Sequence, residues 1–217
     1  MWHARFGHLH FAALRKMGRD GLVHGMPLLT QVEHVCDACL TGKHRRAPFP
    51  QRTQGCSSEV LQLLHGDLCG PITLPTPSGN RYFLLLVDDY SRYMWLALLP
   101  SKDAAPAAIK RIQAATERKS GKLVRALRTD RGGEFLVKDF EQYCAELGLR
   151  HELTAPYSPQ QNGVVERRNQ SVVGTARSML KAKGLPGEFW GEAVTTTVYL
   201  LNRSSSKSMG GKTPYEL

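Results

Sequence analysis

The sequence lacks a long apolar segment. No stretch approaches the roughly eighteen consecutive apolar residues that a membrane-spanning helix needs. The opening residues, MWHARFGHLH, also lack the apolar centre of a secretory signal peptide. We therefore expect a protein that is neither secreted nor inserted in a membrane. Internal repeats and low-complexity tracts are absent from the sequence as well.

The cysteines do not form the even, regularly spaced set of a disulfide framework. There are five, at positions 36, 39, 56, 69 and 144, and only Cys36 and Cys39 lie close together. An odd number with one Cys-x-x-Cys pair is more typical of an intracellular protein with a metal site.

Acidic residues are scarce relative to basic ones. Lys and Arg number 29 against 19 Asp and Glu, a formal net charge of +10. This balance suits a polyanionic partner, because each phosphate neutralised by Lys or Arg releases condensed counterions. On charge alone, a basic protein without a nucleic-acid partner is the alternative. An anionic membrane surface ranks third, since no basic amphipathic helix stands out.

The composition otherwise predicts a folded protein of one or two domains. Hydrophobic residues make up 41% and charged residues 22% of the 217 positions, which argues against general disorder. Residues 1–47 are rich in His, Arg and Lys and too short for a large core, so they need a staple. Residues 48–58 (PFPQRTQGCSS) read as a linker. Residues 59–217 form the larger domain.

The apolar pattern of this larger domain predicts strands followed by alternating helices and strands. Strands are expected over residues 61–68, 82–87, 94–99, 124–129 and 150–153. Helices are expected over residues 103–119 with Asp103 as the cap, over 138–147, over 161–183, and from Pro186 onward. The apolar face of the second helix consists of Phe140, Tyr143, Cys144 and Leu147. This order indicates a mixed α/β layer fold.

A candidate zinc site lies in the first 47 residues. His3 and His8 are separated by four residues, and Cys36 and Cys39 follow after another 27. Two imidazole nitrogens and two thiolates suit tetrahedral Zn²⁺, which would fold a segment that has little core of its own. A redox-active cysteine pair is the alternative. Competing ligands of lower rank are His10, His34 and His44.

Three carboxylates are placed where they could converge at one rim of the sheet. Asp67 lies near the end of the first strand, Asp130 at the end of a later strand, and Glu166 near the start of the long helix. Carboxylates from three segments can hold two divalent cations, which neutralise charge during phosphoryl transfer. On pattern alone, Asp88 and Asp89 compete for this role because they also follow a strand.

Short motifs in the sequence resemble those of copia-type retrotransposon integrases. They are WHARFGHL, CDACLTGK, HGDLCGP, LLVDDYSRYMW, RTDRGGEF, APYSPQQNGVVERRN and KTPYEL, in this order over nearly the whole chain. The 35 residues between Asp130 and Glu166 match the spacing of the D,D-35-E integrases and transposases.

The resemblance implies an RNase H-like catalytic core behind a Gag-pre-integrase zinc module with one structural Zn²⁺. It assigns catalysis and two Mg²⁺ or Mn²⁺ ions to Asp67, Asp130 and Glu166, and leaves Asp88 and Asp89 as turn residues. Glu134 is expected to be solvated. The implied reactions are 3′-end processing of element cDNA and strand transfer into host DNA. Water and then a DNA 3′-hydroxyl act as nucleophiles, without a covalent enzyme intermediate.

The same resemblance implies DNA as partner, a homo-oligomer on DNA, no small-molecule cofactor, and action in the nucleus after a cytoplasmic particle stage. Family members continue beyond KTPYEL within a Gag-Pol polyprotein, so we expect this chain to be a fragment. A catalytically silent DNA-binding remnant or a host-adopted protein of the same fold is the alternative function. An RNase H-type nuclease is a further alternative.

Candidate DNA contacts gather near the long helix and just after the cysteine pair. Helical spacing places Asn162, Glu166, Gln170 and Val173 on one face, which we expect to look at the active site. The full set of candidate DNA-binding residues is Asn162, Gly163, Arg167, Arg168, Gln170, Lys43, Arg45 and Arg46. Gly163 would let the backbone bend beside the DNA.

Overall fold

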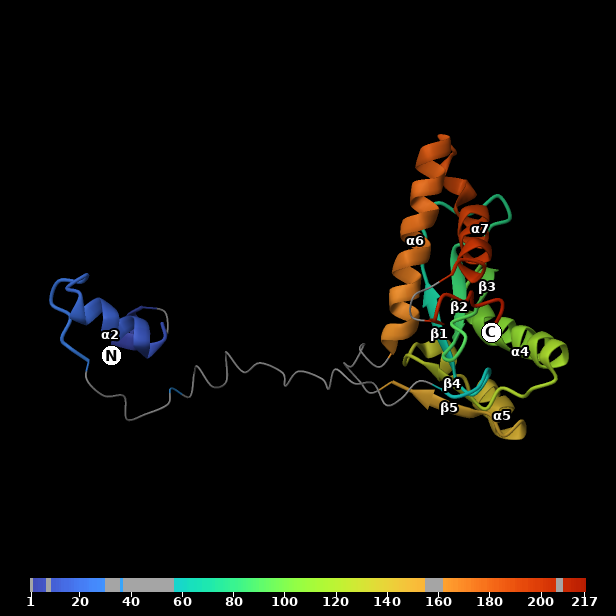
Figure 1. Ribbon diagram of the computed structural model, residues 1–217, viewed down its shortest axis with the longest axis horizontal. Coiled ribbons are helices and arrows are strands. Elements are labelled where there is room, and N and C mark those ends of the chain that lie inside the picture. Colours follow the sequence, from blue (N-terminus) through green and yellow to red (C-terminus); the bar gives the residue numbers. More distant parts are fainter. Residues whose placement is uncertain (1, 7–8, 30–35, 37–56, 155–161, 206–208) are drawn as a thin grey trace. The chain divides into compact units, whose positions relative to one another are not determined.

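The computed structural model describes residues 2–6, 9–29, 36, 57–154, 162–205 and 209–217 (Figure 1). The chain divides into two compact units, Met1–Gln51 and Arg52–Leu217. This division falls inside the range 48–58 that the sequence predicts as a linker. No helix among the described residues is both long enough and apolar enough to cross a membrane.

The first unit contains two short helices, α1 (Trp2–Arg5) and α2 (Phe11–Arg19). The His10 side chain caps α2 by accepting a hydrogen bond of 3.1 Å from the Ala13 backbone N–H. Leu14 is the only buried hydrophobic residue in the described part of this unit. The expectation that this unit needs a staple stays a prediction.

The second unit is built on a five-stranded mixed sheet. Its strands are β1 (Leu64–Cys69), β2 (Tyr82–Asp88), β3 (Met94–Leu99), β4 (Ala126–Thr129) and β5 (Arg150–Leu153), in the order β3-β2-β1-β4-β5. β1, β2 and β3 pair antiparallel, whereas β4 pairs parallel to β1 and β5 parallel to β4. The mixed α/β prediction is confirmed.

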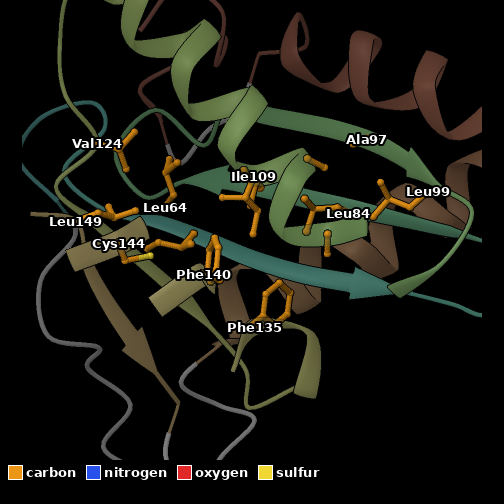
Figure 2. Packing of buried hydrophobic residues seen from close by; sticks show 14 of the residues in the cluster. Leu64, Leu84, Ala97, Leu99, Ile109, Val124, Phe135, Phe140, Cys144 and Leu149 are labelled. Atoms are coloured by element: carbon orange, nitrogen blue, oxygen red, sulfur yellow. The ribbon is translucent and has the colours of Figure 1, made fainter. Parts of the chain in front are cut away.

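Helices cover both faces of this sheet (Figure 1). On one face lie α4 (Ala105–Ser120) and α5 (Lys138–Glu146). Figure 2 shows Ile109 of α4 and Phe140 of α5 packed with Leu84 of β2 and Leu64 of β1. On the other face, α6 (Gly163–Lys183) and α7 (Trp190–Asn202) pack together over β1, β2 and β3.

β2 is the apolar centre of the sheet. Successive side chains of a strand point to opposite faces. Leu84 and Leu86 pack into the apolar cluster on the face covered by α4 and α5, which we call the α4 core. Phe83, Leu85 and Val87 pack into the cluster on the face covered by α6 and α7, the α6–α7 core. All five are fully buried. The continuous run YFLLLV therefore reflects a strand covered on both sides.

Several predicted boundaries are wrong for reasons the structure explains. The first strand begins at Leu64 rather than at residue 61, because Leu61 has a positive φ of 64° and donates its N–H to Asp88. Asp103 caps nothing: it lies in the 3₁₀ turn Lys102–Ala104, and α4 has no side-chain cap. Leu147 is 55% exposed because α5 ends at Glu146.

The connections near the site contain two further 3₁₀ turns. Gly133–Phe135 follows β4 and buries Phe135 against the α4 core (Figure 2). Gly187–Phe189 precedes α7, so the final helix begins at Trp190 and not at Pro186 as expected.

Candidate active site

Asp67 and Asp130 lie side by side on neighbouring parallel strands. Leu64 is opposite Leu127 and His65 is opposite Arg128 in the β1–β4 pairing. The same register, continued, sets Asp67 level with Asp130, which directly follows the last residue of β4. Paired strands are about 4.8 Å apart, so the two carboxylates share one edge of the sheet.

Glu166 is brought to this edge by the first turn of α6. Asn169, one turn later, donates a hydrogen bond from Nδ2 to Asp67 Oδ2 at 2.5 Å. Asn162, one turn earlier, donates from Nδ2 to the Gly66 carbonyl at 3.2 Å. Both contacts join α6 to β1, and Glu166 lies between them on the helix.

The charges of the three acids act on one another. Burial raises the pKa of Asp67 to about 6, and the negative charges of Asp130 and Glu166 add to the increase. Hydrogen bonds from the Asn169 side chain and the Leu68 N–H oppose it. A carboxylate that is partly buried beside two other acids would gain most from a nearby cation.

The donor set fits a hard divalent cation. Carboxylate oxygens are what Mg²⁺ and Mn²⁺ prefer. No three His, Cys, Asp or Glu side chains in the described parts of the chain are close enough to hold one ion together. Mg²⁺ sites commonly use one or two carboxylates with water and substrate phosphates completing the shell. Three carboxylates shared between two ions would supply that number.

Asp130 is held by contacts of the loop that follows β4. Its Oδ1 accepts a hydrogen bond from the Gly132 N–H at 3.0 Å. Arg131 Nε donates to the Thr154 carbonyl at 2.9 Å, which ties the loop to the end of β5. Glu134 is half-buried, and its carboxylate folds back against Gly132. A Cβ added to Gly132 would lie 2.7 Å from Glu134 Oε1.

Asp88 has a structural role at the other end of β1. It pairs with Leu64 in the β1–β2 ladder, three residues before Asp67. The fully buried carboxylate accepts hydrogen bonds from the Leu61 N–H (2.8 Å) and from the Ser91 N–H (2.8 Å) and hydroxyl (2.7 Å). Asp88 is therefore a turn residue, as expected.

Asp89 is the centre of a second buried cluster. Its Oδ1 lies 3.0 Å from both His65 Nε2 and Arg92 Nη1, and its Oδ2 accepts from the Ser57 N–H at 2.7 Å. Burial alone would raise the pKa of this carboxyl group. The hydrogen bonds from His65 and Ser57 and the charge of Arg92 outweigh burial and lower it. Asp89 is thus a fixed anion that joins the turn to β1.

The amide of α6 that contacts Asp67 is one that the sequence did not single out. Gln170 is exposed, whereas Asn169 is only 8% exposed and contacts Asp67. Asn169 lies three residues after Glu166 and seven after Asn162, a spacing that also stacks side chains on one helix face. That spacing was the only indication in the sequence, and it did not show whether Asn169 or Gln170 faces Asp67.

The other DNA candidates of α6 lie around its first two turns. Arg167 is exposed, and a Cβ added to Gly163 would lie 3.0 Å from its Nη1. Arg168 is half-buried, and burial with the nearby charge of Arg92 lowers its pKa. Asn162 is 2% exposed. The candidates Lys43, Arg45 and Arg46 lie outside the described residues.

One proposed zinc ligand has a conformation suited to metal binding. His3 Nδ1 donates to the Leu9 carbonyl at 2.8 Å, and its ring stacks on Phe11 with centroids 4.4 Å apart. A backbone carbonyl bound at one ring nitrogen commonly orients the other for a metal. Cys36 is half-buried. His8 and Cys39 lie outside the described residues, as do His34 and His44, so the ligand set stays a prediction.

Two family matches cover most of the chain. The integrase core domain matches residues 57–159, and the GAG-pre-integrase domain matches residues 1–44. The chain is a homologue of plant copia-type retrovirus-related Pol polyproteins. Its second unit therefore contains an integrase core domain, and its first unit a GAG-pre-integrase domain.

The related polyproteins are much longer than this chain. The Pol polyprotein from transposon TNT 1-94 of Nicotiana tabacum is 39% identical over 214 residues, which is 99% of this chain and 16% of the relative. Those from transposons RE2 and RE1 of Arabidopsis thaliana are 27% and 26% identical over 217 residues, which is 14% of each relative. The integrase homologue thus spans about a sixth or less of their length.

A solved structure shows the same fold. A chain in the cryo-EM structure of the simian T-cell lymphotropic virus intasome in complex with PP2A regulatory subunit B56 gamma matches with a TM-score of 0.66 at 20% identity. The match covers 100% of this chain and 72% of that chain. The RNase H-like prediction is confirmed at the level of the fold.

Proposed function

We propose that this integrase homologue catalyses divalent-metal-dependent 3′-end processing and strand transfer of element cDNA into host DNA. One observation carries the proposal: the register of β1 and β4 sets Asp67 level with Asp130, and burial, together with the charges of Asp130 and Glu166, raises the pKa of Asp67 to about 6. Three acids that repel one another at one sheet edge form a site for cations.

Asp67 is the carboxylate best placed to be shared by two ions. It is level with Asp130 on β1 and is bonded through Asn169 to the helix that carries Glu166. Asp130 and Glu166 would hold the ions together with Asp67. When bound, Mg²⁺ or Mn²⁺ supplies charge neutralisation at the attacking and leaving oxygens and lowers the pKa of the nucleophile.

Both proposed reactions exchange one phosphodiester oxygen for another. In end processing, a water oxygen bonds to phosphorus, and the bond to the 3′ oxygen of the cDNA breaks, leaving a 3′-hydroxyl. In strand transfer, that 3′-hydroxyl oxygen bonds to a host phosphorus, and a host 3′ oxygen leaves. The protein's own contribution is to hold the carboxylates in place, with no covalent bond to DNA.

The DNA partner would be held through phosphates. Arg167, Arg168 and Gln170 lie within two turns of Glu166, close to the proposed reaction site. Lys43, Arg45 and Arg46 would add contacts after the cysteine pair. Arg and Lys contacts to phosphates position DNA without reading its sequence. Because two cDNA ends have to be joined, we propose a homo-oligomer on DNA, acting in the nucleus.

For the first unit we propose one structural Zn²⁺ bound by His3, His8, Cys36 and Cys39. The hydrogen bond from His3 Nδ1 to the Leu9 carbonyl supports this assignment, because metal-binding histidines commonly donate one ring N–H to a backbone carbonyl. The small core of this unit supports a folding role for the metal.

Strand transfer of a labelled duplex carrying an element end into plasmid DNA, with Mn²⁺, tests the enzymatic proposal. The wild type should give joined products, and Glu166→Gln should give none while still binding DNA. Glu188→Gln, which removes an exposed acid before α7, is the matched control and should behave as the wild type.

Three outcomes would contradict the proposal. If wild type and Glu166→Gln are equally inert while DNA still binds, the chain is a catalytically silent remnant or a host-adopted binding protein. If the wild type instead cleaves RNA selectively in an RNA–DNA hybrid, it is an RNase H-type nuclease. Loss of activity in Glu188→Gln would mean that the assay reports general charge rather than the site.

A further inference from the structure

Two asparagines, Asn162 just before α6 and Asn169 within it, bind consecutive residues of β1. Asn162 Nδ2 donates to the Gly66 carbonyl at 3.2 Å, and Asn169 Nδ2 donates to Asp67 Oδ2 at 2.5 Å. A separation of seven residues is about two helical turns, so both side chains leave the helix on the same side. The helix is therefore held on β1 both before and after Glu166.

The Asp67 carboxylate is oriented by these contacts. Its Oδ1 accepts the Leu68 N–H at 3.0 Å, while its Oδ2 accepts from Asn169. An ionised carboxylate offers about four acceptor positions, so each oxygen keeps a lone pair for another partner. The direction of the remaining lone pairs is thus set before any cation binds.

Stability alone does not account for the two asparagines. They are 2% and 8% exposed, and the Oδ1 of each has no hydrogen-bond partner among the described residues. Burying an amide with one group unpaired costs free energy. Asn202 shows the contrasting case, since its Oδ1 accepts the Met94 N–H (2.9 Å) and its Nδ2 donates to the Met94 carbonyl (2.8 Å).

We propose that Asn162 and Asn169 are positioning residues that fix Asp67 relative to Glu166 for divalent-cation binding. Asn169 acts on the carboxylate itself, whereas Asn162 acts through the backbone of Gly66, so Asn169 has the larger effect. This inference rests on the proposed two-ion site.

The test compares Asn169→Leu with Asn202→Leu in the full chain. Both changes keep volume and remove an amide that joins a helix to a strand. Mn²⁺ binding is measured without DNA by electron paramagnetic resonance, and stability by thermal unfolding. Asn169→Leu should weaken Mn²⁺ binding about tenfold or more, as expected when a residue that orients a metal ligand is lost. Its unfolding temperature should be no lower than that of the wild type. Asn202→Leu should lower the unfolding temperature and leave Mn²⁺ affinity unchanged.

Two further variants keep the inference testable. Asn162→Leu should weaken Mn²⁺ binding less than Asn169→Leu does. If the Asn169→Leu variant does not fold, Mn²⁺ affinity is measured on Asn169→Ser instead. Its side chain is too short to reach Asp67, so it should also weaken Mn²⁺ binding. Wild-type Mn²⁺ affinity in a folded Asn169 variant would overturn the inference while leaving the proposed function in place. If the wild type binds no Mn²⁺, or Glu166→Gln binds it equally well, the proposed function and this inference both fail.

Discussion

At the scale of single residues, Asp67 and Asp89 show how the same side chain acquires opposite properties. Asp67 has hydrogen bonds from Asn169 and Leu68, but burial and two neighbouring acids outweigh them and raise its pKa. Asp89 is also buried, yet the His65 and Ser57 hydrogen bonds and the charge of Arg92 lower its pKa. A cation bound beside Asp67 would therefore stabilise its carboxylate, whereas Asp89 is already paired with Arg92.

The raised pKa of Asp67 gives a pH-dependent effect on stability in metal-free protein. Asp67 titrates at about 6 when folded and at about 3.9 when unfolded. Its favourable contribution is complete below the unfolded value and is lost as pH rises through the folded one. Asp67→Asn should therefore unfold at a higher temperature than wild type at pH 7, with a smaller difference at pH 4.

Thermal unfolding in a chelator at the two pH values measures this. Asp103→Asn is the control, because Asp103 is exposed and caps no helix. A difference between Asp67→Asn and wild type that does not change from pH 4 to pH 7 would contradict the pKa assignment.

Asp89→Asn should have the opposite effect. Asp89 contributes stability that is complete above its unfolded pKa of about 3.9 and is lost progressively as pH falls from there through its lower folded pKa. Breaking a buried, hydrogen-bonded ion pair costs about 3 kcal/mol, so the variant should be clearly destabilised at pH 7. Urea unfolding at pH 7 and pH 3 measures this, and an equal loss at both would show that shape rather than charge matters.

The choice among aspartates could not be made from pattern alone. Asp67, Asp88 and Asp89 all lie in or beside apolar strands, and only the motif resemblance favoured Asp67. Their roles depend on partners far away in sequence: Leu61 and Asp88 are 27 positions apart, and Asp67 and Asn169 are 102 positions apart. Local residue patterns carry no information about such contacts.

At the scale of elements, the bounds of several strands and of the end of the long helix were predicted well. β3 and β5 have the predicted bounds, and α6 ends at Lys183 as expected. The errors occur at ends determined by tertiary contacts, such as the start of β1 and the start of α7. Periodicity reports which face of an element is buried but not where a neighbouring turn interrupts it.

Two helical glycines provide an element-scale prediction about packing. A Cβ on Gly191 of α7 would lie 2.8 Å from Thr76 Cγ2 and 2.9 Å from Leu98 Cδ1, whereas one on Gly174 of α6 would meet nothing within 4 Å. Gly191→Ala should cost about 1–3 kcal/mol by overpacking. Gly174→Ala should add up to about 1 kcal/mol by helix propensity. Denaturant titration compares the two, and a Gly191→Ala variant as stable as the wild type or more so would mean that the contact of α7 with Thr76 and Leu98 is loose.

At the scale of the whole molecule, we propose that the two units have different sources of stability. The second has two apolar cores, one on each face of its sheet. Among described residues of the first, only Leu14 is a buried hydrophobic residue. Two units that hold together by different means should unfold separately.

Zinc removal should therefore unfold the first unit and leave the second intact. The wild type should contain about one zinc ion per chain, and Cys36→Ser combined with Cys39→Ser should lose it, because thiolates are two of the four proposed ligands. Metal analysis by mass spectrometry measures the zinc. Circular dichroism should lose the signal of α1 and α2 on chelation, while the main thermal transition stays unchanged. Cys144→Ser, a change in the core of the second unit, should keep the zinc and lower that main transition. Zinc retained by the double variant, or a main transition that shifts with chelator, would show that the metal does not act where His3 and the cysteine pair place it.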